Sequence, residues 1–362
     1  MGLKCGIVGL PNVGKSTLFN ALGSAKAEAA NYPFCTIEPN VGVVNVPDAR
    51  LVEIATLVKA QRTVPASTEI VDIAGIVKGA SKGEGLGNKF LAHIREVDAI
   101  VNLVRCFENS DIVHVDGSVD PARDIEVVRT ELLLADLETL DKRIDKDARM
   151  AKSGDKEARK NTEIFAALRV HLDNGQPART FPLDPNDQMR LAPLFLLTAK
   201  PVLYVANASA KSGDQAYVKV VEEVAMREGA KHVVLDCGVE SEIAQLPPED
   251  RQEFISAMGL EEPGLNRFIR SAFELLGLIT YYTAGPKEAR AWTIPRGTKA
   301  PQAAGVIHSD FERGFICAEC FRSEDLVKLG SELKIREAGL VKQEGKEYVV
   351  QAGDVLLFRF NV

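Results

Sequence analysis

The 362-residue sequence lacks an apolar run long enough to cross a membrane. Its longest apolar stretch, residues 191–206, is interrupted by Lys200 and by prolines, whereas a membrane-spanning helix needs about 20 consecutive apolar residues. The first residues hold only a short apolar segment, too short for the core of a secretion signal. Position 6 also lacks the Ser or Thr that N-myristoylation requires after Gly2. These absences predict a cytoplasmic protein without a membrane partner.

The sequence also lacks an excess of basic residues and a set of clustered cysteines. Its formal net charge is −7, which excludes a uniformly basic surface for nucleic acid but allows a local basic patch. The only close cysteine pair, Cys317 and Cys320, has no second pair nearby to complete the four ligands of a zinc site. We interpret the two as ordinary thiols in a strand and a turn.

The residues that are present predict an α/β fold. Hydrophobic residues make up 46% of the chain, and short apolar runs alternate with helical segments such as residues 15–22. Continuous apolar runs between helices are typical of a parallel sheet that is covered on both faces. The expected strands are residues 4–8, 41–46, 69–71, 99–104, 202–206 and 232–236.

A helical segment interrupts this alternation. Leucine and isoleucine recur at helical spacing over residues 119–150 and, after a turn at residues 152–155, over a second stretch that closes at residues 174–177. The pattern predicts a helical hairpin that projects, because a first arm of about 30 residues is about 45 Å long. Its tip, residues 142–160, carries eight basic and four acidic side chains. The tip is either a solvated face or a contact for RNA phosphate.

The C-terminal segment predicts a small α+β domain. Trp292 is expected in its core, and residues 323–329 are expected to form a short helix. The expected strands there are residues 289–294, 333–337, 348–351 and 355–360.

The strongest chemical signal lies at residues 9–17, which read GLPNVGKST. This phosphate-loop pattern follows an expected strand and opens an expected helix, as the motif requires. Backbone N–H groups of such a loop surround phosphates, Lys15 reaches the outer phosphates, and the Ser16 hydroxyl is placed to bind Mg²⁺. The expected nucleotide-binding residues in the loop are Asn12, Val13, Gly14, Lys15, Ser16 and Thr17.

Three further elements follow in the order of a nucleotide-dependent switch. Thr36 lies after the first helix, where a threonine closes over the γ-phosphate and completes the Mg²⁺ shell. Asp72 and Gly75 frame a DxxG sequence at the end of a strand, which places a carboxylate near the metal and a glycine N–H at the γ-phosphate. Asn207 follows a later strand, at the position of a base-reading loop. We therefore predict Ser16, Thr36 and Asp72 at the metal, and Lys15, Thr36 and Gly75 in catalysis.

In their details these motifs resemble the YchF (Obg-like ATPase) family. The matching stretches are NVGKST at 12–17, NYPFCTI at 31–37 and DIAGIVKGA at 72–80, and the resemblance spans nearly the whole chain. It implies a P-loop, GTPase-like domain at 1–118 and 199–277. A helical coiled-coil insertion at 119–198 and a C-terminal β-grasp (TGS) domain at 278–362 complete the implied arrangement. It also implies ATPase activity, ribosome binding and a preference for adenine over guanine nucleotides.

The base loop supports part of this preference independently. Guanine readers usually place an Asp in this loop, but here Asn207 is followed by Ala208, Ser209 and Ala210. Without a carboxylate, two guanine donors remain unpaired, whereas Asn207 and the backbone near Ala208 suffice for adenine. Ala210 departs from the family, which usually has Glu there, and this weakens the expected ATP preference.

The catalytic water has no evident partner in the sequence. Ile76 stands where Ras-like enzymes place a glutamine, so another group must orient the water. Asn12 has two interpretations: it helps to bind K⁺, which would supply positive charge at the phosphates, or it only shapes the loop. His93 and His114 are interpreted as structural residues.

Together these features predict a Mg²⁺-dependent nucleoside triphosphatase that uses ATP, with GTP as a secondary substrate. It would act as a nucleotide-gated switch on the ribosome, with RNA contacted through the basic tip. Two alternatives stay open: a binding module for RNA or protein that nucleotide merely locks, and a conventional GTPase.

Overall fold

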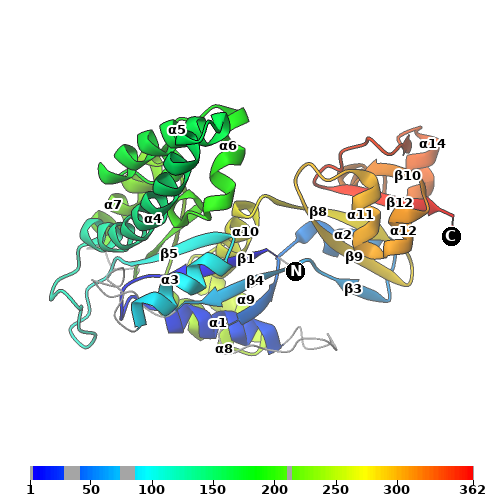
Figure 1. Ribbon diagram of the computed structural model, residues 1–362. Helices are drawn as coiled ribbons and strands as arrows, with labels where there is room; N and C mark the ends of the chain where they lie inside the picture. Colours follow the sequence, from blue (N-terminus) through cyan, green and yellow to red (C-terminus); the bar gives the residue numbers. More distant parts are fainter. Residues whose placement is uncertain (1–2, 28–40, 74–85, 210–213, 362) are drawn as a thin grey trace. The chain divides into compact units, whose positions relative to one another are not determined.

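Figure 1 shows a computed structural model, which describes residues 3–27, 41–73, 86–209 and 214–361. The chain forms two compact units. Unit 1 comprises Met1–Gly42 and Glu69–Ser271, and unit 2 comprises Val43–Thr68 and Ala272–Val362. Unit 2 thus contains an early segment that the sequence analysis assigned to the nucleotide-binding domain. Among the described helices, none is both long and apolar enough to cross a membrane.

The first of two six-stranded sheets has the order β2-β4-β1-β5-β6-β7, and most of it lies in unit 1. The pairings from β4 through β7 are parallel, as the apolar runs predicted. Every residue of β5 and β6 is buried, because the strands are central in the sheet and helices cover it. The strands are β1 (Lys4–Val8), β2 (Val41–Asn45), β4 (Ser67–Asp72), β5 (Ala99–Arg105), β6 (Val202–Asn207) and β7 (Lys231–Leu235).

Two helices around this sheet begin shortly after the carboxyl end of a strand: α1 (Lys15–Ala27) after β1 and α8 (Cys237–Gln245) after β7. Parallel strands place their carboxyl ends at one edge, so the described parts of the loops after β1, β5, β6 and β7 meet there, together with the end of β4. The other helices around the sheet are α3 (Leu86–Glu96), α7 (Gln215–Arg227), α9 (Pro248–Ala257) and α10 (Gly264–Leu275). Helix α1, which follows the loop after β1, packs against α8, which follows the loop after β7. This contact brings the two loops together.

The expected helical hairpin consists of α4 (Pro121–Lys152) and α5 (Lys156–Asp173), which pack along each other. Asp120 caps α4 by accepting a hydrogen bond from Arg123 N, and Pro121 occupies its first turn. The shared core includes Leu140, Phe165 and Leu168. The hairpin is not bare, because side chains from α6 (Pro185–Leu191) and the 3₁₀ turns η2 (Ala178–Thr180) and η3 (Ala192–Leu194) join this core.

Unit 2 has its own core under a second six-stranded sheet, with the order β11-β10-β12-β8-β9-β3. Its strands are β3 (Arg62–Val64), β8 (Leu278–Ala284), β9 (Glu288–Pro295), β10 (Phe315–Arg322), β11 (Lys342–Glu344) and β12 (Asp354–Phe360). Its helices are α2 (Ala49–Leu57), α11 (Ala300–Ile307), α12 (Ser309–Arg313), α13 (Ser323–Leu329) and α14 (Glu332–Glu337). Trp292 is half-buried and packs against this core, in which Tyr281 is fully buried.

Two expected strands of this region were wrong. Residues 333–337 lie in helix α14, because the Ser331 side chain accepts a hydrogen bond from Lys334 N and caps a helical turn. Residues 348–351 form only an isolated bridge between Val349 and Lys299. Strand β8 was not anticipated, and β10 was expected only in that one of its two cysteines was placed in a strand. Cys317 and Cys320 both lie within β10, rather than in a strand and a turn.

Candidate functional site

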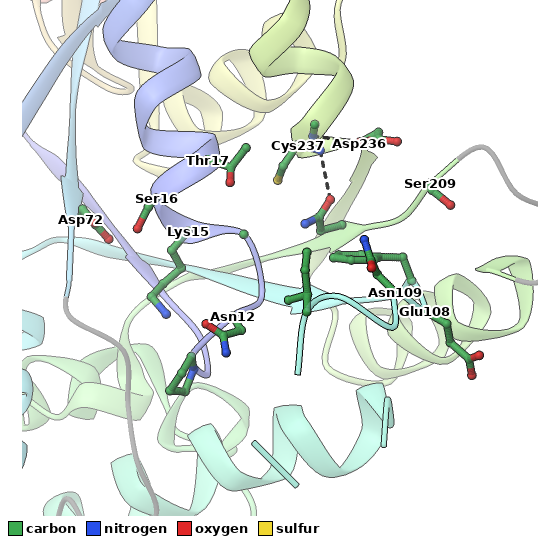
Figure 2. Close-up of a pocket in the computed structure, with 16 residues that line it drawn as sticks. Asn12, Lys15, Ser16, Thr17, Asp72, Glu108, Asn109, Ser209, Asp236 and Cys237 are labelled. Atoms are coloured by element: carbon green, nitrogen blue, oxygen red, sulfur yellow. Dashed lines mark hydrogen bonds between the residues drawn. The ribbon is translucent and has the colours of Figure 1, made fainter. Parts of the chain in front are cut away.

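A cavity of about 740 Å³ opens at the carboxyl-end edge of the sheet in unit 1. Its lining comes from the loops that follow β1, β5, β6 and β7 and from the end of β4 (Figure 2). The lining residues are Pro11, Asn12, Gly14, Lys15, Ser16, Thr17, Asp72, Phe107, Glu108, Asn109, Ile112, Asn207, Ser209, Asp236, Cys237 and Gly238. The structure therefore brings Asp72 and Asn207 to the same cavity as the 9–17 loop.

The 9–17 loop has a backbone that only particular residues tolerate. Gly14 has a φ of +104°, and a Cβ at this position would lie 2.5 Å from the Asn207 amide nitrogen. A side chain here would push the base loop away from the phosphate loop. Asn12 also adopts a left-handed conformation, with a φ of +62°, which asparagine accepts more readily than most residues. These two backbone conformations fix the turn of the loop, and both residues line the cavity.

Lys15 provides the positive charge of the cavity. Its Nζ donates hydrogen bonds to the carbonyls of Gly9 at 2.9 Å and Leu10 at 2.7 Å. Burial lowers the pKa of its ammonium group to about 8, and the nearby Asp72 carboxylate opposes that shift. An ammonium held by its own loop, beside the first turn of α1, forms an anion site of the kind that binds phosphate.

Asp72 provides a half-buried carboxylate near Lys15. Its Oδ1 is buried and accepts no hydrogen bond among the described residues, and burial raises its pKa while Lys15 lowers it. The Ser16 hydroxyl lines the same cavity and is exposed. Hard divalent cations such as Mg²⁺ prefer carboxylate and hydroxyl oxygens, so this pair fits a magnesium ion. Of the metal-binding residues that the sequence predicted, Ser16 and Asp72 are the two that the structure describes.

Asn207 joins the base loop to the phosphate loop. Its Nδ2 donates to Val13 O at 2.9 Å, and its Oδ1 accepts from Cys237 N at 3.0 Å. Asn207 is itself buried, so its amide holds three loops together instead of being free in the cavity. Asp236 stabilises the third loop, because its Oδ1 caps α8 by accepting from Gly238 N and Val239 N.

The other predicted residues occupy different places. Val13 is buried beneath the loop, and Thr17 lines the cavity. Ala208 lines a neighbouring cavity of about 350 Å³, and its backbone N–H donates to Leu235 O at 3.0 Å, so this donor is not available to a base. Thr36 and Gly75 lie outside the described residues. Ile76 and Ala210 also lie outside them.

Two groups of lining residues were missed by sequence reasoning: residues 107–112 after β5 and residues 236–238 after β7. A signal for both was present, because each group follows an apolar run that the sequence identified as a strand of the parallel sheet. Loops at the carboxyl ends of neighbouring parallel strands are the usual ligand-binding position.

The two histidines have no contact with this cavity. His93 is exposed on α3. His114, Asp116 and Asp124 lie close enough to hold a metal ion, but both ring nitrogens of His114 are already engaged. Nε2 is 2.8 Å from Asp124 Oδ2, and Nδ1 accepts from Asp116 N at 3.1 Å. This arrangement is a hydrogen-bonded pair that fixes the loop before α4.

Comparison with known proteins gives consistent results for both parts of the chain. The family model described as "50S ribosome-binding GTPase" matches residues 4–144. The model of the YchF-GTPase C-terminal family, described as a protein of unknown function, matches residues 278–361.

Full-length relatives extend this result. The "Ribosome-binding ATPase YchF" of Escherichia coli O157:H7 is 53% identical over 363 residues, with 100% of both chains covered. The protein of the same name from Bacillus subtilis (strain 168) is 54% identical over 367 residues, again with 100% of both covered. The solved structure of the Schizosaccharomyces pombe YchF GTPase matches with a TM-score of 0.89 and 36% identity, covering 99% of this chain and 98% of that one. With these matches and its phosphate loop, the chain belongs to the YchF family, a P-loop GTPase-type domain joined to a YchF-type C-terminal domain.

Proposed function

We propose that the protein is a Mg²⁺-dependent nucleoside triphosphatase that prefers ATP to GTP and acts as a nucleotide-gated switch on the ribosome. The observation that carries this proposal is the convergence of Lys15, Ser16, Asp72 and Asn207 on one cavity. It agrees with the name of the relatives from Escherichia coli and Bacillus subtilis, ribosome-binding ATPase. It is also supported by the size of the cavity, which lies in the usual range for nucleotide-sized ligands.

In the proposed mechanism, phosphates bind along the 9–17 loop. Lys15 releases the carbonyls of Gly9 and Leu10 and turns to the outer phosphates, where backbone N–H groups at the start of α1 add positive potential. Ser16 and Asp72 would hold a magnesium ion, which neutralises charge on the phosphate oxygens when it is bound. Thr36 and Gly75 are proposed to close over the γ-phosphate.

The sequence motifs assign no residue to orient the attacking water. Asn12 lines the cavity, its Nδ2 donates to Val113 O at 3.1 Å, and among the described residues its amide oxygen accepts no hydrogen bond. That oxygen supports the proposal that K⁺ binds beside the phosphates, where it would place positive charge. Replacing K⁺ with Na⁺ should then lower turnover, whereas an unchanged rate would leave Asn12 as a loop-shaping residue.

The ATP preference is supported by the carboxylates around the base loop. Asp214 accepts hydrogen bonds from both the backbone and the hydroxyl of Ser209, and it lines the neighbouring cavity instead of this one. Glu108 accepts from the Tyr217 hydroxyl. A guanine edge would need a free carboxylate here to pair its two donors.

One observation favours a conventional GTPase as the second candidate. The Asp236 carboxylate lines the cavity near Asn207, and the bonds to α8 occupy one of its two oxygens. Competition between ATP and GTP for the wild-type site separates the two candidates, and tighter binding of GTP would reject the adenine preference.

The ribosome and RNA part of the proposal is supported by the tip of the helical hairpin. Among the described residues, four exposed basic side chains there form no ion pair: Lys146, Arg149, Lys152 and Lys156. Their neighbours Lys142 and Arg143 are paired with acids of α4. Basic side chains without an ion pair are available to bind RNA phosphates. The RNA then releases its counterions, and this release drives the binding.

The deciding experiment is calorimetry with ATP and Mg²⁺, followed by steady-state hydrolysis with and without ribosomes. Binding that is lost in Lys15→Ala, together with hydrolysis that ribosomes stimulate, is the expected result. Binding without measurable turnover would favour the non-catalytic binding module. Absence of binding for either purine triphosphate at millimolar concentration would reject the function altogether.

A further inference from the structure

Arg105, the last residue of β5, is one of the largest fully buried side chains among the described residues. Its guanidinium forms no ion pair with any acidic side chain that the structure describes. Instead, it donates hydrogen bonds to three backbone carbonyls of the loop that follows: Phe107 O at 3.0 Å, Ile112 O at 2.9 Å and Asn109 O at 3.3 Å. A buried charge without an ion pair is costly. The carboxylates of Asp124 and Glu108 act on it from a distance, but its hydrogen bonds all go to a single loop.

The loop that Arg105 holds forms one wall of the nucleotide cavity. Phe107, Glu108, Asn109 and Ile112 all line the cavity, and the guanidinium lies 4.6 Å from the centre of the Phe107 ring. We call residues 107–112 the wall loop. In Figure 2, Glu108 and Asn109 lie toward Ser209, whereas Lys15 and Asp72 lie on the opposite side of the cavity.

This arrangement separates two functions within one cavity. Lys15, Ser16 and Asp72 gather at the phosphate end, while the wall loop, Ser209 and Asp236 form the other end, where the base and ribose must lie. Among the described side chains, Arg105 is the only one that donates hydrogen bonds to backbone carbonyls of the wall loop. The next carbonyl along the chain, that of Val113, accepts a hydrogen bond from Asn12. The planar fork of an arginine reaches three carbonyls at once, which the single ammonium of lysine does not.

We propose that Arg105 is a positioning residue for the base end of the site, holding the wall loop against the nucleoside. The inference rests on the proposed function, because it assumes that a nucleotide occupies the cavity. It predicts that Arg105 supports recognition of the nucleoside and contributes little to recognition of the phosphates.

The test compares ADP with inorganic tripolyphosphate by calorimetry on the full-length protein. Tripolyphosphate occupies only the phosphate end, whereas ADP also contacts the wall loop. Arg105→Met and Arg105→Lys should weaken ADP binding at least about tenfold, which corresponds to about 1.4 kcal/mol of binding free energy. Tripolyphosphate binding should remain within about a factor of two, which corresponds to about 0.4 kcal/mol. In hydrolysis, KM should rise while kcat at saturating ATP stays near the wild-type value.

Arg143→Met is the matched control, because Arg143 is a partly exposed arginine that pairs with Asp147 on α4, and neither residue lines the cavity. It should leave ADP binding unchanged. Equal weakening of ADP and tripolyphosphate in the Arg105 variants, or no weakening of either, would overturn the proposal.

Folding and the underlying function are tested separately. If neither Arg105 variant folds by circular dichroism, Phe107→Leu probes the same wall without removing the buried charge, and it should weaken ADP selectively. Unchanged ADP binding in Phe107→Leu would reject a wall that contacts the nucleoside. If wild-type protein binds tripolyphosphate but not ADP or ATP, the proposed function fails, which is distinct from a failure confined to the Arg105 variants.

Discussion

We expect Lys15 to make the affinity of the cavity for phosphate depend on pH. Burial lowers the pKa of its ammonium group to about 8, so the free protein loses this charge as the pH rises through about 8. A bound triphosphate favours the charged form and raises the pKa again, so binding takes up a proton above pH 8. We expect the Kd for ATP to be flat below about pH 7 and to rise above pH 8, by up to about tenfold per pH unit.

Calorimetry between pH 6.5 and 9.5 would measure this dependence, with the proton uptake obtained from buffers of different ionisation enthalpy. Lys15→Ala serves as the control, because its residual binding should lack the step near pH 8. A wild-type Kd that stays constant up to pH 9.5 would contradict the role given to this lysine.

Asp72 is expected to act on the metal and not on the phosphates directly. Asp72→Asn keeps the size of the side chain but removes the charge of a carboxylate oxygen that has no described protein partner. The apparent affinity for Mg²⁺ in the presence of ATP should fall about 10–100-fold, as it does for residues that support metal ligands. Titrating Mg²⁺ at fixed ATP would measure the change. If Mg²⁺ affinity is unaltered while Mg²⁺-free ATP binding drops, the metal assignment is wrong.

At the scale of elements, one carboxylate ties the hairpin to the sheet domain. Asp136 on α4 is buried and accepts hydrogen bonds from Leu197 N, Thr198 N and the Thr198 hydroxyl, where the 3₁₀ turn η4 (Leu197–Ala199) leads into β6. Asp136→Ala should lower the free energy of unfolding by about 3 kcal/mol, because each unpaired buried donor costs about 1–3 kcal/mol.

Urea unfolding would measure this loss of stability. The control is Asp141→Ala on the same helix, which breaks an exposed pair with Arg169 and should change the free energy of unfolding far less, because exposed ion pairs contribute little. Similar losses in both variants would show that the buried carboxylate carries no special weight.

The tip of the hairpin allows a separate test of polyanion binding. Reversing Arg149, Lys152 and Lys156 to Glu should weaken binding to ribosomes or ribosomal RNA. The dependence of log K on log salt should become shallower by about 0.7 for each single-strand phosphate that these side chains neutralise in the wild type. The matched control reverses Lys89, Lys219 and Arg227, which are exposed on α3 and α7 and change the net charge equally. Equal effects of the two triple variants would indicate a response to net charge instead of binding at the tip.

The phosphate loop was predictable because its nine residues are consecutive in the sequence and match a known motif. The hairpin was predictable for a related reason, since side chains four apart along a helix share a face. The wall loop was not, because only the order of parallel strands brings Asn109 next to Ser209. Helix α14 was missed because its pattern is short and its cap, Ser331, lies just outside the apolar stretch. In the cavity, the sequence identified Lys15, Ser16, Asp72 and Asn207 and overlooked residues 107–112 and 236–238.

At the scale of the whole molecule, nucleotide should stabilise the two units unequally. All residues that line the cavity belong to unit 1, while unit 2 has a separate core that includes Tyr281 and Phe358. At a ligand concentration 100 times Kd, binding stabilises the folded state by about 2.7 kcal/mol. Hydrogen exchange without ribosomes should therefore show slower exchange in β5 and β6 and little change in β8 and β12. Equal protection of both units would contradict this expectation.

Strand β3 has a consequence for how the chain matures during synthesis. Its Val64 pairs with Arg290 of β9, more than two hundred residues further along, so the partner is made long after β3 has left the ribosome. At translation rates of about 5–20 residues per second, that interval is roughly 10–45 s. Throughout it, β3 cannot pair in its native sheet, and an unpaired strand is open to wrong partners. Newly made chains should therefore depend on chaperones until the last hundred residues emerge.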